Sequence, residues 1–511
     1  MTMERTYIGV VDQGTTGTRF MVFDRGGRVV ASAHERHEQR CPRPGWVEHD
    51  PVEIWENVTR AITRGLSTAA VDAEQLAALG VANQRETTAV WDAETGEPVC
   101  DALVWLDRRT ADRCEERKAA GEADWIRAKT GLEVDAYFSA PKLEWILDNA
   151  DPIEADPGRE DVRDRAEAGE VLFGTVDSWL VYNLTGEHVT DVTNASRTLL
   201  FDIHDLAWDD DLLAEFDVPA AMLPEVRPSS DEATYGSTDP EDFLGAEVPV
   251  TGALGDQQAA LIGQTCFEVG EVKNTYGTGA FCLMHTGTEA VESDNGLLTT
   301  VGFQRSGEPV QYALEGTIFM TGAAIEWLED VGFVDDPADS ARLAHSVDAA
   351  EGVCVVPPFT GLGTPHWDGH ASGVIMGITR GTRAGHIVRA TLESIACQTR
   401  NVVEAMEADT GRDVGCLRVD GGAVKNDFLC QLQADIIGTD IARPVVDETT
   451  ALGAAYAAGL AVGYWDSLAE LRDHWRADRT FTPDADREDA DRTYGRWVEA
   501  VESARDWERG G

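Results

Sequence analysis

The chain has 511 residues, and its 43% hydrophobic content with 14 tryptophans allows two domains with real cores and excludes wholesale disorder. It carries 92 acidic and 42 basic residues, a formal net charge of −50, which would repel nucleic acids and anionic membranes. No apolar run is long enough to cross a bilayer, and we expect no signal peptide before the first strand. Composition therefore predicts a cytoplasmic protein that inserts in no membrane and binds no nucleic acid.

The acidic residues are spread along the whole chain, and lysine is rare. The only lysines are Lys118, Lys129, Lys142, Lys273 and Lys425. This composition is similar to that of cytoplasmic proteins from extreme halophiles. The nine cysteines form no C-x-x-C pair and no zinc-type Cys/His cluster, so we expect small, buried, reduced side chains.

The first 23 residues predict a tight hairpin around a polar turn. Apolar runs at 7–11 and 20–23 flank the sequence Asp12-Gln13-Gly14-Thr15-Thr16-Gly17-Thr18-Arg19. The turn offers backbone N–H groups, three threonine hydroxyls and Arg19, all donors that suit a phosphate. Asp12, at the expected strand end, could hold Mg²⁺ through water. Taken alone, the motif fits an ordinary surface hairpin equally well.

Strand-like and helix-like segments then alternate through the first half. We expect strands at 28–31, 79–82, 88–91 and 103–105, and helices over 51–70 and 143–147. The polar, acidic stretch 148–170 predicts a solvated excursion.

A second set of similar elements begins near residue 250. A strand over 248–254 precedes a helix over 255–262, and Tyr276-Gly277-Thr278-Gly279-Ala280-Phe281 repeats the Gly/Thr turn between apolar runs. A strand at 417–420 leads into Gly421-Gly422 and a helix near Asn426. Two halves with matching turns predict a duplicated α/β fold that closes around a nucleotide, divided into domains 1–254 and 255–511.

Together these motifs resemble the FGGY carbohydrate kinase family, and within it the members that phosphorylate glycerol. The family-typical patterns lie at 137–149 and over 373–378 to 386–393. The stretches similar to glycerol-phosphorylating members are Pro44-Gly45-Trp46-Val47-Glu48-His49-Asp50, Asn83-Gln84-Arg85-Glu86-Thr87-Thr88, Gly255-Asp256-Gln257-Gln258 and Asn274-Thr275-Tyr276-Gly277-Thr278-Gly279. The resemblance runs from about Tyr7 to Trp507.

The resemblance implies two RNase H-like domains of the actin and hexokinase type, with the active site in the interdomain cleft. It implies conversion of glycerol and ATP to sn-glycerol 3-phosphate and ADP, with Mg²⁺ as the metal. We also expect a homo-oligomer, either a dimer or a tetramer.

Glycerol needs several polar partners and one or two flat apolar walls. Arg85 and Glu86 form a donor fork beside an acceptor, after an apolar strand, although such a pair is commonly a surface ion pair. The resemblance assigns the glycerol contacts to Arg85, Glu86, Tyr137, Asp256 and Gln257, and the apolar walls to Trp105 and Phe281. Plain core packing is the alternative for both aromatic residues.

Phosphoryl transfer needs a carboxylate that accepts the hydroxyl proton, and Asp256 fits this role beside Gln257, with a helix N-cap as the alternative. The resemblance implies Mg²⁺ at Asp12 and Asp256, and nucleotide contacts at Thr15, Thr16, Gly17, Arg19, Thr278, Gly322, Glu326, Gly422 and Asn426. Two positions depart from the family pattern, because many relatives have serine at position 17 and glutamine at position 326.

Two other functions compete: an FGGY kinase for a pentulose or another polyol, and a nucleotide-binding sensor without transfer activity. The small-triol residues argue against the first, and the intact Asp12 and Asp256 argue against the second. Some relatives are controlled by fructose 1,6-bisphosphate or by histidine phosphorylation at one loop. The matching stretch here, 237–247, has no lysine, arginine or histidine and contains four acidic residues, so we expect neither control.

Overall fold

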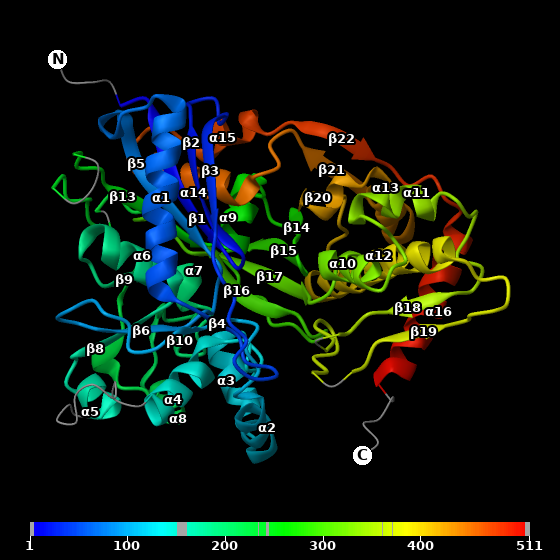
Figure 1. Cartoon of the computed structure of the whole chain (residues 1–511), viewed down its shortest axis with the longest axis horizontal. Coiled ribbons are helices and arrows are strands. Elements are labelled where there is room, and N and C mark those ends of the chain that lie inside the picture. Colours follow the sequence, from blue (N-terminus) through cyan, green and yellow to red (C-terminus); the bar gives the residue numbers. More distant parts are fainter. Residues whose placement is uncertain are drawn as a thin grey trace.

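The computed structural model describes residues 5–150, 161–233, 235–241, 245–359, 361–369 and 371–505. Two large β-sheets organise the molecule: in Figure 1 the first lies on the left, around β1, and the second extends from the middle of the molecule towards the right, as far as β22. Among the described helices, none is both long and apolar enough to span a bilayer.

The first sheet has five strands, and helix α1 (Pro51–Ala69) packs against it. Its strands in spatial order are β13 (Val250–Gly255), β5 (Leu76–Asn83), β1 (Tyr7–Gly14), β2 (Gly17–Phe23) and β3 (Val29–Arg36). β5 is buried along its whole length, as expected for a central strand between two parallel neighbours.

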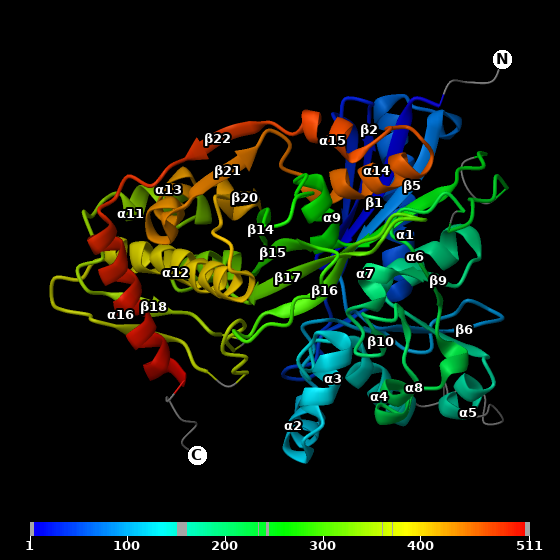
Figure 2. The ribbon, with the colours of Figure 1, turned by 180° about the vertical axis from the view of Figure 1, so that it is seen from behind.

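The second sheet has seven strands, and the 27-residue helix α12 (Ala384–Thr410) packs against it. Its strands in spatial order are β16 (Leu298–Phe303), β17 (Gln311–Ile318), β15 (Ala280–Gly287), β14 (Val272–Tyr276), β20 (Cys416–Gly421), β21 (Asp440–Pro444) and β22 (Ala477–Phe481). Helix α16 (Arg487–Arg505) lies at the outer end of this half (Figure 2).

Both sheets share one topology, which confirms the predicted duplicated α/β fold. In the first, β1 pairs antiparallel with β2 and parallel with β5, and β5 pairs parallel with β13. In the second, β14 pairs antiparallel with β15 and parallel with β20, and β20 pairs parallel with β21. Each half thus places a hairpin turn at the carboxyl end of its central strand.

Two helices join the halves at the base of the cleft. α9 (Asp256–Gly263) packs against α14 (Thr449–Ala461), which also contacts β13, β5 and β1 of the first sheet (Figure 1). The crossing is so close that a Cβ on Gly453 would stand 1.8 Å from the Ala259 carbonyl oxygen, so only glycine fits there. The chain thus passes from the first sheet to the second between Gly255 and Val272, and α14 later returns to the first sheet.

The first half also contains smaller elements outside its five-stranded sheet. They are β4 (Glu48–His49), β6 (Ala89–Asp92), β7 (Ala102–Leu103), β8 (Val171–Gly174), α2 (Ala111–Ala120), α3 (Ala123–Thr130), α4 (Ser139–Asn149), α5 (Val162–Glu167) and α6 (Val176–Thr185). Each strand and helix predicted from the sequence overlaps an observed element, although the ends of several differ; the predicted strand at 103–105 ends at Leu103.

Two expectations need correction. The stretch 148–170 is not wholly a solvated excursion, because α5 buries Val162 and Ala166 against the core; residues 151–160 lie outside the described residues. The cysteines are free thiols as predicted, but they are not uniformly buried, since Cys41 and Cys416 are exposed.

Candidate active site

A cleft between the halves collects most of the predicted site residues. Its walls come from the β1–β2 turn, the loop after β5, the start of α9, the β14–β15 turn and the start of α14. The predicted residues that line it are Asp12, Thr15, Thr16, Gly17, Arg19, Arg85, Glu86, Trp105, Tyr137, Asp256, Gln257, Thr278 and Phe281.

Four residues predicted near the nucleotide lie beside this lining rather than in it. Gly322 begins α10 (Gly322–Asp330), and its N–H donates to the Gly277 carbonyl at 3.1 Å. Glu326 is exposed on the same helix. Gly422 follows the cleft residue Gly421, and Asn426 caps α13 (Asp427–Gln433) by accepting from the Leu429 N–H at 3.1 Å.

The loop after β5 presents Arg85 and Glu86 in a strained conformation. Glu86 has φ of 61°, the left-handed region that costs a non-glycine residue about 1–2 kcal/mol. Gly255 permits the approach of Arg85, because a Cβ there would stand 2.7 Å from Arg85 Cδ. Strain of this kind persists where surrounding contacts fix the backbone, as at ligand sites.

A closed set of buried charges holds this loop. Arg85 donates to both carboxylate oxygens of Glu315, at 2.5 and 3.1 Å. Arg197 donates to Glu315 at 2.9 Å and to Glu86 at 2.7 Å. Burial alone would raise the pKa of Glu315, but the Arg197 and Arg85 guanidiniums outweigh it and lower that pKa to about 2. Because Glu315 lies on β17, this set links the loop of the first half to the second sheet.

Three aromatic rings form a corner of the cleft. Trp105 lies edge-to-face with Tyr137 and with Phe281, at ring-centroid distances of 5.7 and 6.0 Å. The Arg85 guanidinium lies 5.5 Å from the Phe281 ring centroid. Flat apolar surfaces and a charged donor thus meet at one point, which suits a small polyol.

Asp256 stands at the centre of the site, as the first residue of α9. Its Oδ1 lies 3.3 Å from Arg85 Nε, and its Oδ2 accepts from Gln257 Nε2 at 3.0 Å. Burial raises the pKa of Asp256 above its ordinary value, against the opposing effect of Arg85. A carboxylate that is held on both oxygens and has a raised pKa is suited to accept a proton.

The β1–β2 turn differs from its sequence prediction in two details. Asp12 lies within β1, opposite Arg19, rather than at the strand end. The Thr18 hydroxyl is buried and does not reach the cleft, whereas Thr15 Oγ1 accepts from Trp105 Nε1 at 2.9 Å. Gly17 has no room for a side chain, because a Cβ there would stand 2.5 Å from the Glu35 carbonyl oxygen. That crowding by β3 leaves room only for glycine at position 17 of this chain.

Acidic groups crowd the floor of the cleft. Burial raises the pKa of Asp12 to about 7; Arg19 opposes this, while Glu448 and Asp256 add to it. Among the described residues no group of three or more histidine, cysteine, aspartate or glutamate side chains could by itself hold a metal ion. Mg²⁺ does not need such a cage, because it is commonly held by one or two carboxylates, water and substrate phosphates. Asp12 and Asp256 fit that donor set.

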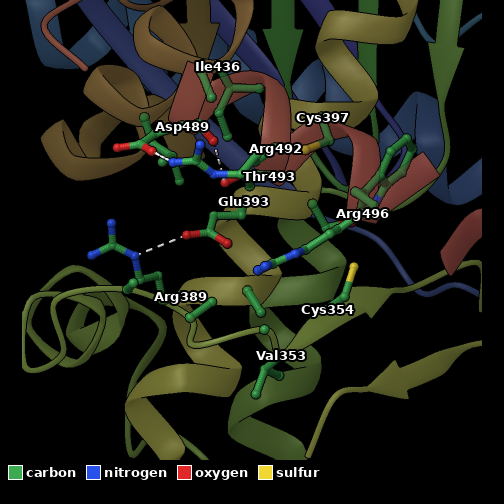
Figure 3. Close-up of a pocket in the computed structure, with 18 of the residues that line it drawn as sticks. Val353, Cys354, Arg389, Glu393, Cys397, Ile436, Asp489, Arg492, Thr493 and Arg496 are labelled. Atoms are coloured by element: carbon green, nitrogen blue, oxygen red, sulfur yellow. Dashed lines mark hydrogen bonds and ion pairs between the residues drawn. The ribbon is translucent and has the colours of Figure 1, made fainter. Parts of the chain in front are cut away.

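A second hollow lies in the C-terminal half, between α12 and α16 (Figure 3). Arg389 and Glu393 form an ion pair at 3.0 Å on its wall, and the thiols of Cys354 and Cys397 face it. Among the described residues that line it, none belongs to the predicted site. The cleft between the halves is therefore the candidate active site.

Sequence reasoning missed Glu315, Arg197 and Lys273, although all three support the site. The sequence does give a signal for Glu315, because this charged residue directly follows the apolar run Tyr312-Ala313-Leu314. Lys273 left another, as one of five lysines, next to a family motif. Arg197 sits in a short polar segment that carries no such signal.

The chain belongs to the FGGY family of carbohydrate kinases. The N-terminal domain model of that family matches residues 7–263, and the C-terminal domain model matches residues 272–462. Over 506 residues the chain is 68% identical to the glycerol kinase of Haloarcula marismortui, covering 99% of each sequence.

Solved structures agree with this assignment. The crystal structure of Plasmodium falciparum glycerol kinase with ADP has a TM-score of 0.88 and 36% identity, covering 98% of each chain. A xylulose kinase from Lactobacillus acidophilus has a TM-score of 0.84 but only 20% identity, over 98% of this chain and 99% of its own, so it supports the fold alone. These matches confirm the predicted fold class.

Proposed function

We propose that this protein is an ATP-dependent glycerol kinase that makes sn-glycerol 3-phosphate and ADP. The observation that carries the proposal is the grouping of Arg85, Glu86, Tyr137 and Asp256 in one cleft, beside two Gly/Thr turns. Whole-length similarity to glycerol kinases supports it, at 68% identity to the Haloarcula marismortui protein.

In the proposed reaction a terminal glycerol hydroxyl attacks the γ-phosphorus of ATP. Arg85 and Glu86 hold neighbouring hydroxyls, and Trp105 and Phe281 cover the carbon chain. Asp256 takes the hydroxyl proton while the new O–P bond forms and the bond to ADP breaks.

The two hairpin turns would hold the phosphates from opposite sides. Thr15, Thr16, Gly17 and Arg19 approach from the first half, and Thr278 approaches from the second. Mg²⁺, held at Asp12 and Asp256, would neutralise phosphate charge when bound. Gly322, Glu326, Gly422 and Asn426 would contact the rest of the nucleotide. We place the domain boundary near residue 254, one residue before the end of the first sheet; the two family-model ranges meet somewhat later, between residues 263 and 272.

We also propose a cytoplasmic enzyme, which the nine free thiols support. The homo-oligomer stays a prediction. The molar mass of the purified protein, measured by light scattering, would test it. A kinase for a pentulose or another polyol is the alternative function, but the xylulose kinase from Lactobacillus acidophilus shares only 20% identity with this chain.

The test is ATP consumption by purified protein in molar KCl with Mg²⁺. Glycerol, dihydroxyacetone, erythritol, xylulose and ribulose are compared at equal concentration. We expect glycerol to give the highest kcat/KM. A pentulose that is phosphorylated much faster than glycerol would contradict the substrate, and no turnover with any of the five would contradict the kinase activity.

A further inference from the structure

Two of the five lysines, Lys142 and Lys273, are fully buried. Removing an ammonium from water costs several kcal/mol unless its hydrogen bonds are replaced. Burial accordingly lowers the pKa of each of these lysines to about 8. Lysine kept at this cost, in a chain that otherwise prefers arginine, indicates a specific structural task at each position.

The Lys273 ammonium has a full set of three acceptors. Its Nζ donates to Gln257 Oε1 at 2.6 Å, to Thr275 Oγ1 at 3.0 Å and to the Phe281 carbonyl at 3.2 Å. Gln257 and Phe281 are both proposed glycerol contacts. One buried cation on β14 therefore ties the start of α9 to the β14–β15 hairpin.

The contact with Lys273 decides how the Gln257 amide is oriented. An ammonium can donate but cannot accept a hydrogen bond, so the amide atom that faces it must be the oxygen. The amide nitrogen must then face the other way, where it donates to Asp256 Oδ2 at 3.0 Å. A flipped amide would set NH₂ against the ammonium and oxygen against the carboxylate, and both contacts would be repulsive.

Asp256 is thereby held by two donors of different origin. Arg85 Nε lies 3.3 Å from Oδ1, and the amide fixed by Lys273 donates to Oδ2. Together they set the rotation of the carboxylate plane. Proton acceptance depends on that rotation, and a misplacement of about 1 Å at a reacting group can cost about 10²-fold in rate.

We propose that Lys273 is a positioning residue, which acts through the Gln257 amide to orient the Asp256 carboxylate for proton acceptance. The proposal rests on the function proposed above. Arginine would not serve in its place, because a planar guanidinium cannot direct donors tetrahedrally at these three acceptors.

The first test is Lys273→Met, which keeps the side-chain volume and removes the charge. We expect kcat with glycerol to fall by about 10²-fold, with the KM for ATP within about 2-fold of wild type. Lys129→Met is the matched control, because Lys129 pairs with Asp209 and Asp211 at the surface, and it should leave kcat unchanged. A kcat for Lys273→Met within 2-fold of wild type would overturn the proposal.

A double-mutant cycle separates the relay through Gln257 from general damage. In a Gln257→Leu background, the Lys273→Met step should reduce kcat by less than about 3-fold, because the relay is already broken. The full 10²-fold loss in that background would show that Lys273 does not act through Gln257.

Gln257→Glu keeps the test decisive if Lys273→Met does not fold. Glutamate still accepts from Lys273, but it cannot donate to Asp256, so kcat should fall at least about 10-fold with an unchanged thermal midpoint. An unchanged kcat in a folded Gln257→Glu protein would overturn the proposal. Wild-type protein that does not phosphorylate glycerol contradicts the proposed function instead, and the variants are then compared on the substrate it does use.

Discussion

The two hairpins that face each other across the cleft have the same topology but carry their cations differently. On β2, Arg19 is 39% exposed and pairs with Glu448 at the edge of the cleft. On β14, Lys273 is fully buried behind the turn and contacts no solvent. The two halves therefore have equivalent hairpins that differ in their cations. The hairpin of the first half presents Arg19 to the space where a nucleotide phosphate would bind, whereas Lys273 of the second half does not reach that space.

This difference predicts a division of labour between the halves. Arg19 would act on ATP, because an exposed guanidinium can leave a carboxylate partner for a phosphate. Lys273 would act on the catalytic carboxylate of Asp256 and on the glycerol contacts, because its three donors are already used within the protein. Substitutions in the two hairpins should therefore affect the kinetics of different substrates.

Among substitutions outside the catalytic carboxylate, Arg85→Ala should give the largest loss, because Arg85 serves both the buried charge set and the substrate. The change leaves Glu315 with one guanidinium partner and removes a glycerol contact. Truncating one member of a buried charge pair costs about 2–5 kcal/mol, so kcat/KM for glycerol should fall by at least about 30-fold. Arg40→Ala, at a partly exposed pair with Asp101, is the control. Near-normal glycerol kinetics in the Arg85→Ala variant would show that Arg85 does not bind glycerol.

Arg19→Ala sharpens the comparison between the hairpins. A hydrogen bond to a charged group contributes about 1.5–3 kcal/mol, so the KM for ATP should rise by roughly 10-fold or more. The KM for glycerol should stay close to wild type, whereas Lys273→Met should lower kcat and leave the KM for ATP close to wild type. Steady-state kinetics with each substrate varied in turn gives both values. An effect on glycerol alone would reverse the proposed division of labour.

Salt should stabilise both halves alike, since acidic residues are spread along the whole chain. At a net charge of −50, repulsion opposes the folded state in dilute buffer. The screening length falls from ~10 Å at 0.1 M to ~3 Å at 1 M salt, which isolates neighbouring carboxylates from one another. Thermal midpoints measured by calorimetry should rise steeply with KCl. A midpoint that stays flat from dilute buffer to molar KCl would contradict this.

The smallest effect is expected from fructose 1,6-bisphosphate. The stretch 237–247 contains four acidic residues and no basic residue, so a doubly phosphorylated sugar would be repelled; residues 242–244 of it lie outside the described part of the chain. Millimolar sugar should leave the rate unchanged in a coupled assay. Saturable inhibition that is abolished by substitutions within 237–247 would contradict the prediction.

The sequence predicted the secondary structure and the site motifs of this molecule better than the contacts between residues that are distant in the chain. Local patterns predicted both hairpins, and the sequence motifs alone indicated that Arg85 and Asp256 belong to the site. The partners of these residues come from distant strands: Glu315 lies 230 positions from Arg85, so no local periodicity could pair them. The crowding at Gly17 was equally inaccessible, because it depends on how closely β3 packs against β2.

Asp256→Asn tests the central claim most directly, because it removes the proton acceptor with little change in shape. The account predicts that kcat with glycerol falls by roughly 10²–10⁴-fold, which corresponds to about 3–5 kcal/mol. The thermal midpoint in molar KCl should stay close to wild type. A kcat near the wild-type value in a folded Asp256→Asn protein would contradict the assignment of the base.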